Sequence, residues 1–295
     1  MKVGSRCGFC LLHRGYQQIL RATDDEDIRR EAVGHILRLI GEEYDQEAVA
    51  ATIGSHRDRV IREVTGCPDP YLELKDEANR MALEILPELE AVVNARPATE
   101  RLRMACLVAC VGNVIEYDVP DHSPEFREVF SRLGDEDLYI DDLDAFESLL
   151  RQEMDLLYLA DNAGEIVFDR LVVRELRALG CRVTVAVKGF PSLNDALMGD
   201  ATEAGMLEAA DGVITTGTDA VGINLSESSG EFLDAYLSAN VILSKGMANW
   251  ETLTEHEAPC PTLFLLRTKC EPVAAAVGAP LQRNIAKLVP EGWRL

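Results

Sequence analysis

The chain has 295 residues, of which 47% are hydrophobic, so it can form one large folded unit or two smaller ones. Its formal net charge of −22 repels nucleic-acid phosphates and argues against nucleic-acid binding. No apolar run has the length of a membrane span, and the N-terminus lacks the apolar stretch of a signal peptide. We therefore expect a cytoplasmic protein without membrane attachment.

The first half of the chain carries apolar residues at helical spacing in one stretch after another. This pattern predicts a mainly helical N-terminal domain over residues 1–150. Thr99 is a suitable N-cap for one of the helices, and Gly112-Asn113 marks its end. The predicted helices cover residues 24–39, 46–64, 71–94, 99–111, 124–133 and 143–154.

The second half, from about residue 151 to residue 295, has a different pattern of apolar residues. Short apolar runs rich in β-formers alternate with helical stretches. This alternation predicts βαβ units, and hence an α/β domain with a mostly parallel sheet covered on both faces. The predicted strands cover 156–160, 182–187, 212–216, 240–244 and 262–267, and the predicted helices 164–179, 194–206, 228–238, 248–255 and 272–277.

Acidic, amide and lysine side chains follow four of the predicted strands. Because the carboxyl ends of parallel strands share one edge of a sheet, these side chains are expected to converge. Carboxylate and amide oxygens suit Mg²⁺ or Mn²⁺, while lysines and backbone N–H groups beside glycines suit phosphate. Together they predict a phosphoryl site with a metal-bound water as nucleophile. In chain order the residues are Asp161, Asn162, Glu165, Lys188, Asn194, Asp195, Asp219, Lys245 and Asn249.

Other functions are compatible with parts of this pattern. An S-adenosylmethionine-dependent carboxyl methyltransferase needs a glycine-rich first loop and an acid after the second strand, where this chain has Lys188-Gly189. A covalent phosphatase with Asp161 as nucleophile usually has a second acid two residues later, where Ala163 stands. A non-catalytic metal or redox module would use the cysteines, and it leaves the polar loops unexplained.

Eight cysteines are present, and three of them have ligand-like spacing. Cys7-x-x-Cys10 offers two thiols, and Cys67 could supply a third, for a soft metal ion or a redox site. His13 could be a fourth ligand. Cys106 and Cys110 lie four residues apart on one predicted helix and are interpreted as buried free thiols.

Three motifs of the second half resemble those of the damage-control phosphatases. They are Asp161-Asn162-Ala163-Gly164-Glu165, Lys188-Gly189-x-Pro191-x-x-Asn194-Asp195, and Ser244-Lys245-Gly246-x-x-Asn249-x-Glu251. Features of the first half are similar to those of the short, cysteine-containing prokaryotic branch of that family. These are Cys7-x-x-Cys10, Cys67-x-Asp69-Pro70-Tyr71 and Gly112-Asn113.

The resemblance implies a helical N-terminal part packed on a Rossmann-like three-layer α/β/α domain. It implies a divalent ion, such as Mg²⁺, Mn²⁺, Co²⁺ or Ni²⁺, on Asp161, Asn162 and Asp195. The implied activity is hydrolysis of small phosphate monoesters, either sugar phosphates or damaged phosphometabolites, with Lys245 holding the phosphoryl group. Glu165, Asp161 and Lys245 are the implied catalytic residues, and Lys188, Asn194, Asp219 and Asn249 are further candidates for contacts with the substrate. One departure is Glu116, where the family has Asp, which puts a ligand role for Glu116 in doubt.

Overall fold

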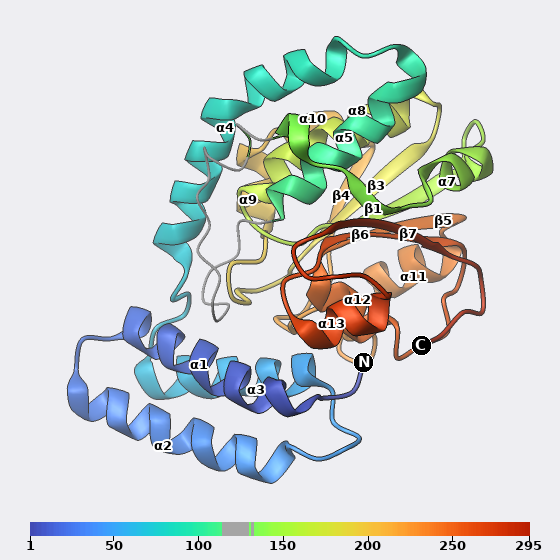
Figure 1. Cartoon of the computed structure of the whole chain (residues 1–295). Helices are drawn as coiled ribbons and strands as arrows, with labels where there is room; N and C mark the ends of the chain where they lie inside the picture. Colours follow the sequence, from blue (N-terminus) through green and yellow to red (C-terminus); the bar gives the residue numbers. More distant parts are fainter. Residues whose placement is uncertain (114–129, 131–132) are drawn as a thin grey trace.

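A seven-stranded sheet runs through the molecule, and the computed structural model describes residues 1–113, 130 and 133–295 (Figure 1). The strand order is β1-β7-β6-β5-β2-β3-β4. The five strands from β6 to β4 in this order are parallel, whereas β7 is antiparallel to β6, and β1 is parallel to β7. The strands are β1 (Leu138–Asp141), β2 (Asp155–Leu159), β3 (Arg182–Val187), β4 (Gly212–Thr215), β5 (Val241–Lys245), β6 (Thr262–Arg267) and β7 (Asn284–Val289).

The central strands are buried on both faces, which explains why they read as continuous apolar runs. In β2, Leu156 and Tyr158 pack into one hydrophobic cluster, and Leu157 and Leu159 pack into another on the opposite face. This alternation follows from the two-residue period of a strand. The predicted α/β fold with a mostly parallel sheet is confirmed.

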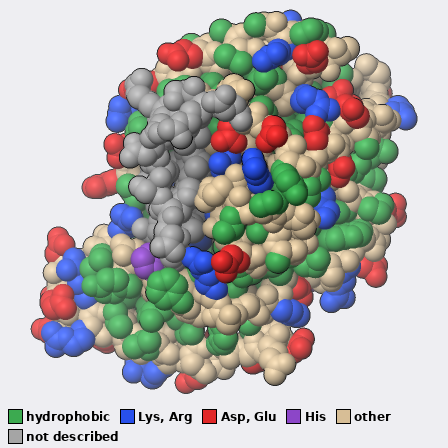
Figure 2. All heavy atoms as spheres, viewed as in Figure 1, with side chains coloured by type: hydrophobic (Ala, Val, Ile, Leu, Met, Phe, Trp, Pro, Cys, Tyr) green, Lys and Arg blue, Asp and Glu red, His purple; other side chains and the backbone are tan. Residues whose placement is uncertain are grey.

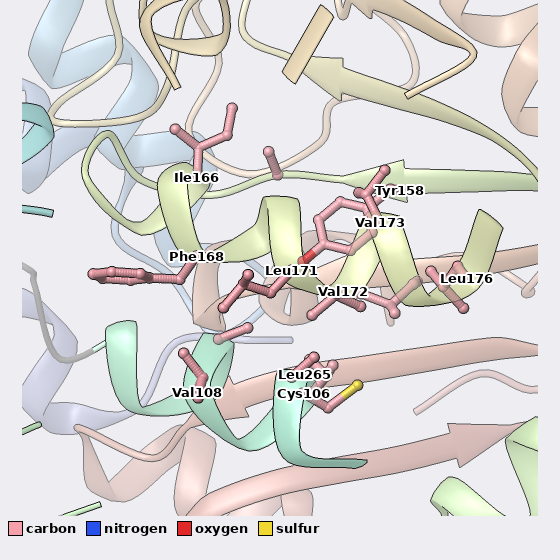
Figure 3. Packing of buried hydrophobic residues seen from close by; sticks show 14 of the residues in the cluster. Cys106, Val108, Tyr158, Ile166, Phe168, Leu171, Val172, Val173, Leu176 and Leu265 are labelled. Carbon is pink, nitrogen blue, oxygen red and sulfur yellow. The ribbon is translucent and has the colours of Figure 1, made fainter. Parts of the chain in front are cut away.

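Helices cover both faces of the sheet and make three layers (Figure 1). On one face, α8 packs beside α5, and its residues Phe168, Leu171 and Val172 are buried there (Figure 3). The helices of this face are α4 (Leu72–Asn94), α5 (Ala98–Gly112), α7 (Leu143–Leu149), α8 (Glu165–Ala178), α9 (Met198–Glu203) and α10 (Met206–Ala209). The helices of the other face are α11 (Gly230–Ser238), α12 (Met247–Leu253) and α13 (Glu271–Val277).

A bundle of three helices lies beside this three-layer body (Figure 1). It consists of α1 (Ser5–Ala22), α2 (Glu26–Glu43) and α3 (Ala50–Thr65). Its core is small and contains the fully buried side chains of Ile19, Ala32, Ile36 and Ile61. Ion pairs to the loop after β4, described below, supplement this packing.

Several elements differ from the sequence-based expectation. Helix α1 and strands β1 and β7 were not predicted. Helix α1 begins at Ser5 and contains the Cys7-x-x-Cys10 stretch, whose spacing also suits metal or redox chemistry. Strand β1 has only four residues and alternates between half-buried and exposed positions, so it lacks the apolar run of a central strand.

Some predicted boundaries were wrong as well. The N-cap of α5 is Pro97 rather than Thr99, because Thr99 already lies inside the helix. The helix predicted over 194–206 starts at Met198 and divides into α9 and α10, since residues 194–196 hold the loop after β3 in place. The predicted helix 143–154 ends at Leu149. Most of the helix predicted over 124–133, and Glu116, lie outside the described residues; residues Leu133–Asp135 form a 3₁₀ turn.

The division into domains 1–150 and 151–295 stays a prediction. One hydrophobic cluster extends across residue 150, because it contains Ala105 and Val108 of α5 together with Ile166 of α8 and Leu263 of β6. Helices α4 and α5 therefore form part of a layer on the sheet, and only α1 to α3 have a separate small core.

Two surface properties bear on the classes of partner. No helix within the described residues has the length and apolar character needed to cross a membrane. On the face that Figure 2 shows, the Lys and Arg side chains of the described residues are interspersed with Asp and Glu side chains. They do not gather into one basic surface on that face.

Candidate functional site

The loops that follow β2 and β3 are bound to each other through their main chains. Asn162 forms an antiparallel bridge with Asp195. The Ala196 N–H donates to the Asp161 carbonyl at 2.8 Å, and the Ala163 N–H donates to the Asn194 carbonyl at 2.9 Å. Because β2 and β3 are adjacent and parallel, their carboxyl ends meet at the same edge of the sheet. The predicted convergence of these two loops is therefore present in the structure.

The main chain of the loop after β5 packs closely against the Asp161 carboxylate. Gly246 has a φ of 78°, a conformation that favours glycine. A Cβ atom at Gly246 would lie 1.9 Å from Asp161 Oδ2. Only glycine therefore allows the carboxylate and the main chain to approach so closely, which gives a physical reason for Lys245-Gly246 after this strand.

Two side-chain amides hold the acidic residues of the site. Asp161 Oδ2 accepts hydrogen bonds from Asn113 Nδ2 and Asn162 Nδ2, both at 2.9 Å. Glu165 Oε2 accepts from the same two amide groups, at 2.8 Å from Asn113 and 2.9 Å from Asn162. All four side chains are buried. Each amide thus lies between two carboxylates and offsets part of their mutual repulsion.

Glu165 also belongs to a second group of buried charges, together with Lys245 and Asp169. Lys245 Nζ donates to Glu165 Oε1, to Asp169 Oδ1 at 2.7 Å and to the Ala109 carbonyl at 3.2 Å. Burial by itself lowers the pKa of Lys245, but Asp169 and Glu165 outweigh it and raise that pKa above its ordinary value. Burial also raises the pKa of Asp169. Since Lys245 has three protein acceptors, it can contact a phosphoryl oxygen only by exchanging one of them.

The other predicted lysine, Lys188, faces the site from the loop after β3. Its Nζ lies 3.5 Å from Asp195 Oδ2 and donates to the carbonyls of Ala220, at 2.8 Å, and Gly222. Both Lys188 and Asp195 are buried. The ammonium therefore supplies positive charge beside Asp195 while the loop after β4 holds it in position.

Two further predicted residues have partners within the protein. Asn249 Nδ2 donates to the carbonyls of Lys245, at 2.8 Å, and Ala160, at 3.2 Å, so it connects the ends of β5 and β2. Asp219 pairs with Arg59, at 2.6 Å, and with Arg62. Burial raises the pKa of Asp219, but the two arginines outweigh burial and lower it below its ordinary value. Contacts of these residues, and of the buried Asn194, with a substrate stay predictions.

Sequence reasoning did not assign Asn113 or Asp169 to the site. Asn113 follows α5 directly, and the only signal for it was the Gly112-Asn113 motif at the end of a predicted helix. Asp169 follows Glu165 by four residues, so both side chains lie on one face of α8. In the sequence Asp169 stands among the apolar residues of a predicted helix, so the spacing from Glu165 is the only local signal for it.

The two loops that follow β2 and β3 provide oxygen donors of the type that a hard divalent cation prefers. Asp161 and Asp195 provide carboxylates, and Asn162 uses its Nδ2 for the hydrogen bonds to Asp161 and Glu165, which leaves its Oδ1 for a cation. Within the described residues no group of three or more His, Cys, Asp and Glu side chains is arranged to hold a metal. A set of two acids and one amide, as here, is consistent with that finding and with the oxygen preference of Mg²⁺ and Mn²⁺.

Two of the three cysteines with ligand-like spacing share a cavity with a fourth cysteine. Cys7, Cys10 and Cys270 line one cavity of about 110 Å³ between α1, α3, α12 and α13. Cys67 follows α3 and is not among the residues that line this cavity. Burial is the main cause that raises the pKa of Cys7 and the pKa of Cys270, the latter to about 12. A role of Cys7, Cys10 and Cys67 in metal or redox chemistry stays a prediction, and the cavity adds Cys270 to the first two thiols.

Known proteins match the chain over almost its full length. A family model described as the damage-control phosphatase ARMT1-like domain matches residues 3–285. A protein of Archaeoglobus fulgidus named damage-control phosphatase is 35% identical over 292 residues, which are 98% of this chain and 100% of that protein. The damage-control phosphatase PH1575 of Pyrococcus horikoshii is 34% identical over 282 residues, covering 95% of this chain and 96% of that protein.

A solved structure matches as well. The crystal structure of a DUF89 family protein from Pyrococcus horikoshii superimposes with a TM-score of 0.86 at 32% sequence identity. The match covers 99% of both chains, so the bundle, the sheet and both helical layers are included.

Proposed function

Because the chain belongs to the damage-control phosphatase ARMT1-like family, we propose that it is a divalent-metal-dependent phosphatase that acts on small phosphate monoesters. The substrates would be sugar phosphates or damaged phosphometabolites. The observation that carries the proposal is the arrangement of Asp161, Asn162 and Asp195 at the carboxyl ends of two adjacent parallel strands.

These three residues would hold the cation. When bound, a divalent ion supplies Lewis acidity toward a phosphoryl oxygen and lowers the pKa of a coordinated water. The protein prepares the ligands in advance. Asn113 and Asn162 orient the Asp161 carboxylate, and the bridge between Asn162 and Asp195 fixes the distance between the two loops.

The lysines would neutralise the negative charge of the phosphoryl group. Lys188 contributes its charge beside Asp195, and Lys245 contributes a second charge beside Glu165. Fixed charges in a buried site stabilise charge that develops during the reaction, because they need little reorganisation. Glu165 orients the Asn113 and Asn162 amides with one oxygen and Lys245 with the other.

The test is hydrolysis of p-nitrophenyl phosphate and a panel of sugar phosphates with Mg²⁺, Mn²⁺, Co²⁺ and Ni²⁺ in separate reactions. We expect phosphate release with at least one of these metals, and EDTA should abolish it. Asp161→Asn and Asp195→Asn should lose about 10²-fold or more in kcat/KM, since each removes one carboxylate from the cation site.

Metal binding is measured separately, by calorimetry with Mn²⁺ and by the increase of Tm on adding Mn²⁺. The increase expected for the wild type should be absent in Asp161→Asn. Asp234→Asn, which replaces an acid on α11 outside the site, is the matched control and should behave as the wild type. Turnover that survives EDTA, or no turnover with any of the four metals, would refute the proposal.

A further inference from the structure

Asp169 is a fully buried carboxylate on α8 that the proposed chemistry does not use directly. Its sequence neighbour Phe168 and the nearby Leu171 and Val172 lie in the core that α8 shares with α5 and the sheet (Figure 3). A buried charge is unfavourable unless a partner compensates it. The charged partner of Asp169 is Lys245, whose Nζ donates to Oδ1 at 2.7 Å, and the Tyr158 hydroxyl on β2 also interacts with this carboxylate.

The Lys245 ammonium thus connects the carboxylate of Asp169 with that of Glu165 at the start of α8. Asp169 lies four residues beyond Glu165 on α8, about 6 Å farther along the helix axis. Glu165 lies at the start of the helix, and its Oε2 accepts from Asn113 and Asn162. A continuous series of contacts therefore runs from Asp169 through Lys245 and Glu165 to the amides that orient Asp161.

The three acceptors of Lys245 are not equivalent. Two are carboxylate oxygens, and the third is the neutral Ala109 carbonyl, whose distance of 3.2 Å exceeds the 2.7 Å to Asp169. Hydrogen bonds between charged partners are stronger than those to neutral carbonyls. When a phosphoryl oxygen arrives, the Ala109 carbonyl is the acceptor that is lost at the lowest cost, provided that Asp169 retains the ammonium.

We propose that Asp169 is a positioning residue for Lys245: its carboxylate holds the ammonium from the core side and leaves Lys245 able to exchange an acceptor for a phosphoryl oxygen. Without Asp169, only Glu165 and the Ala109 carbonyl would hold the ammonium, and it would be held less firmly for contact with a phosphoryl oxygen. The inference relies on the proposed phosphatase function for the identity of the ligand, and it concerns only how the lysine is held.

A double-mutant cycle with inorganic phosphate tests this role. Phosphate affinity is measured by calorimetry at saturating Mn²⁺ for the wild type, Asp169→Asn, Lys245→Ala and the double variant, and kcat/KM is measured for the same four proteins. Asp169→Asn should weaken phosphate binding and lower kcat/KM by at least about tenfold, with Mn²⁺ affinity changed by less than about threefold. In the Lys245→Ala background, Asp169→Asn should change phosphate affinity by less than about twofold, because its effect acts through the lysine.

A second cycle uses Asp169→Glu, which keeps the charge and thereby the compensation of Lys245. This variant should recover part of the affinity that Asp169→Asn loses, and the cycle remains measurable if Asp169→Asn does not fold. Asp58→Asn is the matched control: Asp58 is also buried and pairs with Arg57 at 2.6 Å within α3. It should lower Tm but leave phosphate affinity unchanged.

Three results would overturn the inference. They are unchanged phosphate affinity in Asp169→Asn, an equal loss in the presence and absence of Lys245, and no recovery in Asp169→Glu. If the wild type binds phosphate but hydrolyses no ester, the proposed function fails while the positioning role is still decided by the binding cycle. A wild type that binds no phosphate overturns the positioning role, whereas the proposed function is decided by ester hydrolysis alone.

Discussion

At the residue scale, a small number of buried charged and amide side chains compensate one another in the site. Lys245 compensates Glu165 and Asp169, while the amides of Asn113 and Asn162 lie between Glu165 and Asp161. Because each buried carboxylate needs a partner, removal of one member affects its neighbours as well. The residues of the site therefore act as a network, and variants should be compared in pairs.

Burial also protects two cysteines near the site from alkylation. Cys106 and Cys110 of α5 are fully buried, and burial raises the pKa of both thiols, to about 12 for Cys110. Alkylation requires an accessible thiolate. We therefore expect iodoacetamide at pH 8 to leave Cys106 and Cys110 unmodified in the folded protein, whereas the half-buried Cys67 should react.

Peptide mass spectrometry measures this labelling, and the same reaction in guanidinium chloride is the control, in which all eight cysteines should be modified. Labelling of Cys106 in the native protein at the rate of Cys67 would contradict the packing of α5 against α8.

At the element scale, short turns between strands and helices decide which side chains meet. The turn from β5 into α12 passes the Asp161 carboxylate at Gly246, where a Cβ would lie 1.9 Å from Oδ2. The turn after α13 contains Gly278, which also has a positive φ, but a Cβ added there would have no atom within 4 Å. Both glycines have a positive φ, but only at Gly246 would a Cβ atom collide with another residue.

Gly246→Ala should therefore do more damage than Gly278→Ala. Gly278→Ala forces alanine into the left-handed conformation, which costs about 1 kcal/mol. Gly246 has a φ of 78° and a ψ of 166°, a region essentially restricted to glycine, so alanine there costs about 1–3 kcal/mol. Gly246→Ala additionally displaces Asp161 and should weaken Mn²⁺ binding by at least about tenfold. Chemical denaturation and Mn²⁺ calorimetry on both variants measure the two effects, and equal Mn²⁺ affinity in both would show that Asp161 is not held by this turn.

At the scale of the whole molecule, charged contacts connect the three-helix bundle to the sheet. Arg59 and Arg62 of α3 pair with Asp219 in the loop after β4, and Arg59 also pairs with Glu227. The core of the bundle is small, so these ion pairs are expected to contribute noticeably to its attachment.

This attachment should depend on pH in a defined direction. The folded protein lowers the pKa of Asp219, because the arginines outweigh the effect of burial. Its charged form is therefore stabilised by folding; that contribution is complete above the unfolded pKa of about 3.9 and is lost as the pH falls through the lower folded value. Asp219→Asn should cost about 1 kcal/mol at pH 7, and the difference from the wild type should shrink as the pH falls below about 3.9.

Urea denaturation at pH 7 and at pH 3 measures this difference, with Asp234→Asn as the control for loss of a carboxylate elsewhere on the surface. A cost of Asp219→Asn that is the same at both pH values would show that the ion pairs do not supply it.

The sequence by itself determined the fold class and identified several of the polar residues that follow the central strands. The strands predicted at 182–187 and 262–267 agree with β3 and β6, because strands buried on both faces need continuous apolar runs that stand out locally. The polar residues after β2, β3 and β5 were recognisable for the same reason, since they end those runs. The short edge strand β1 and the antiparallel β7 gave no such signal.

Only the tertiary structure decided which of these side chains touch. The amide of Asn113 lies within hydrogen-bond distance of Asp161, 48 residues later, and Lys245 meets Asp169, 76 residues earlier. Cys270 joins Cys7 and Cys10 at one cavity in the same way. Such contacts depend on how α5, α8 and α13 pack against the sheet, and that packing is set by the summed shape of many side chains rather than by any local pattern.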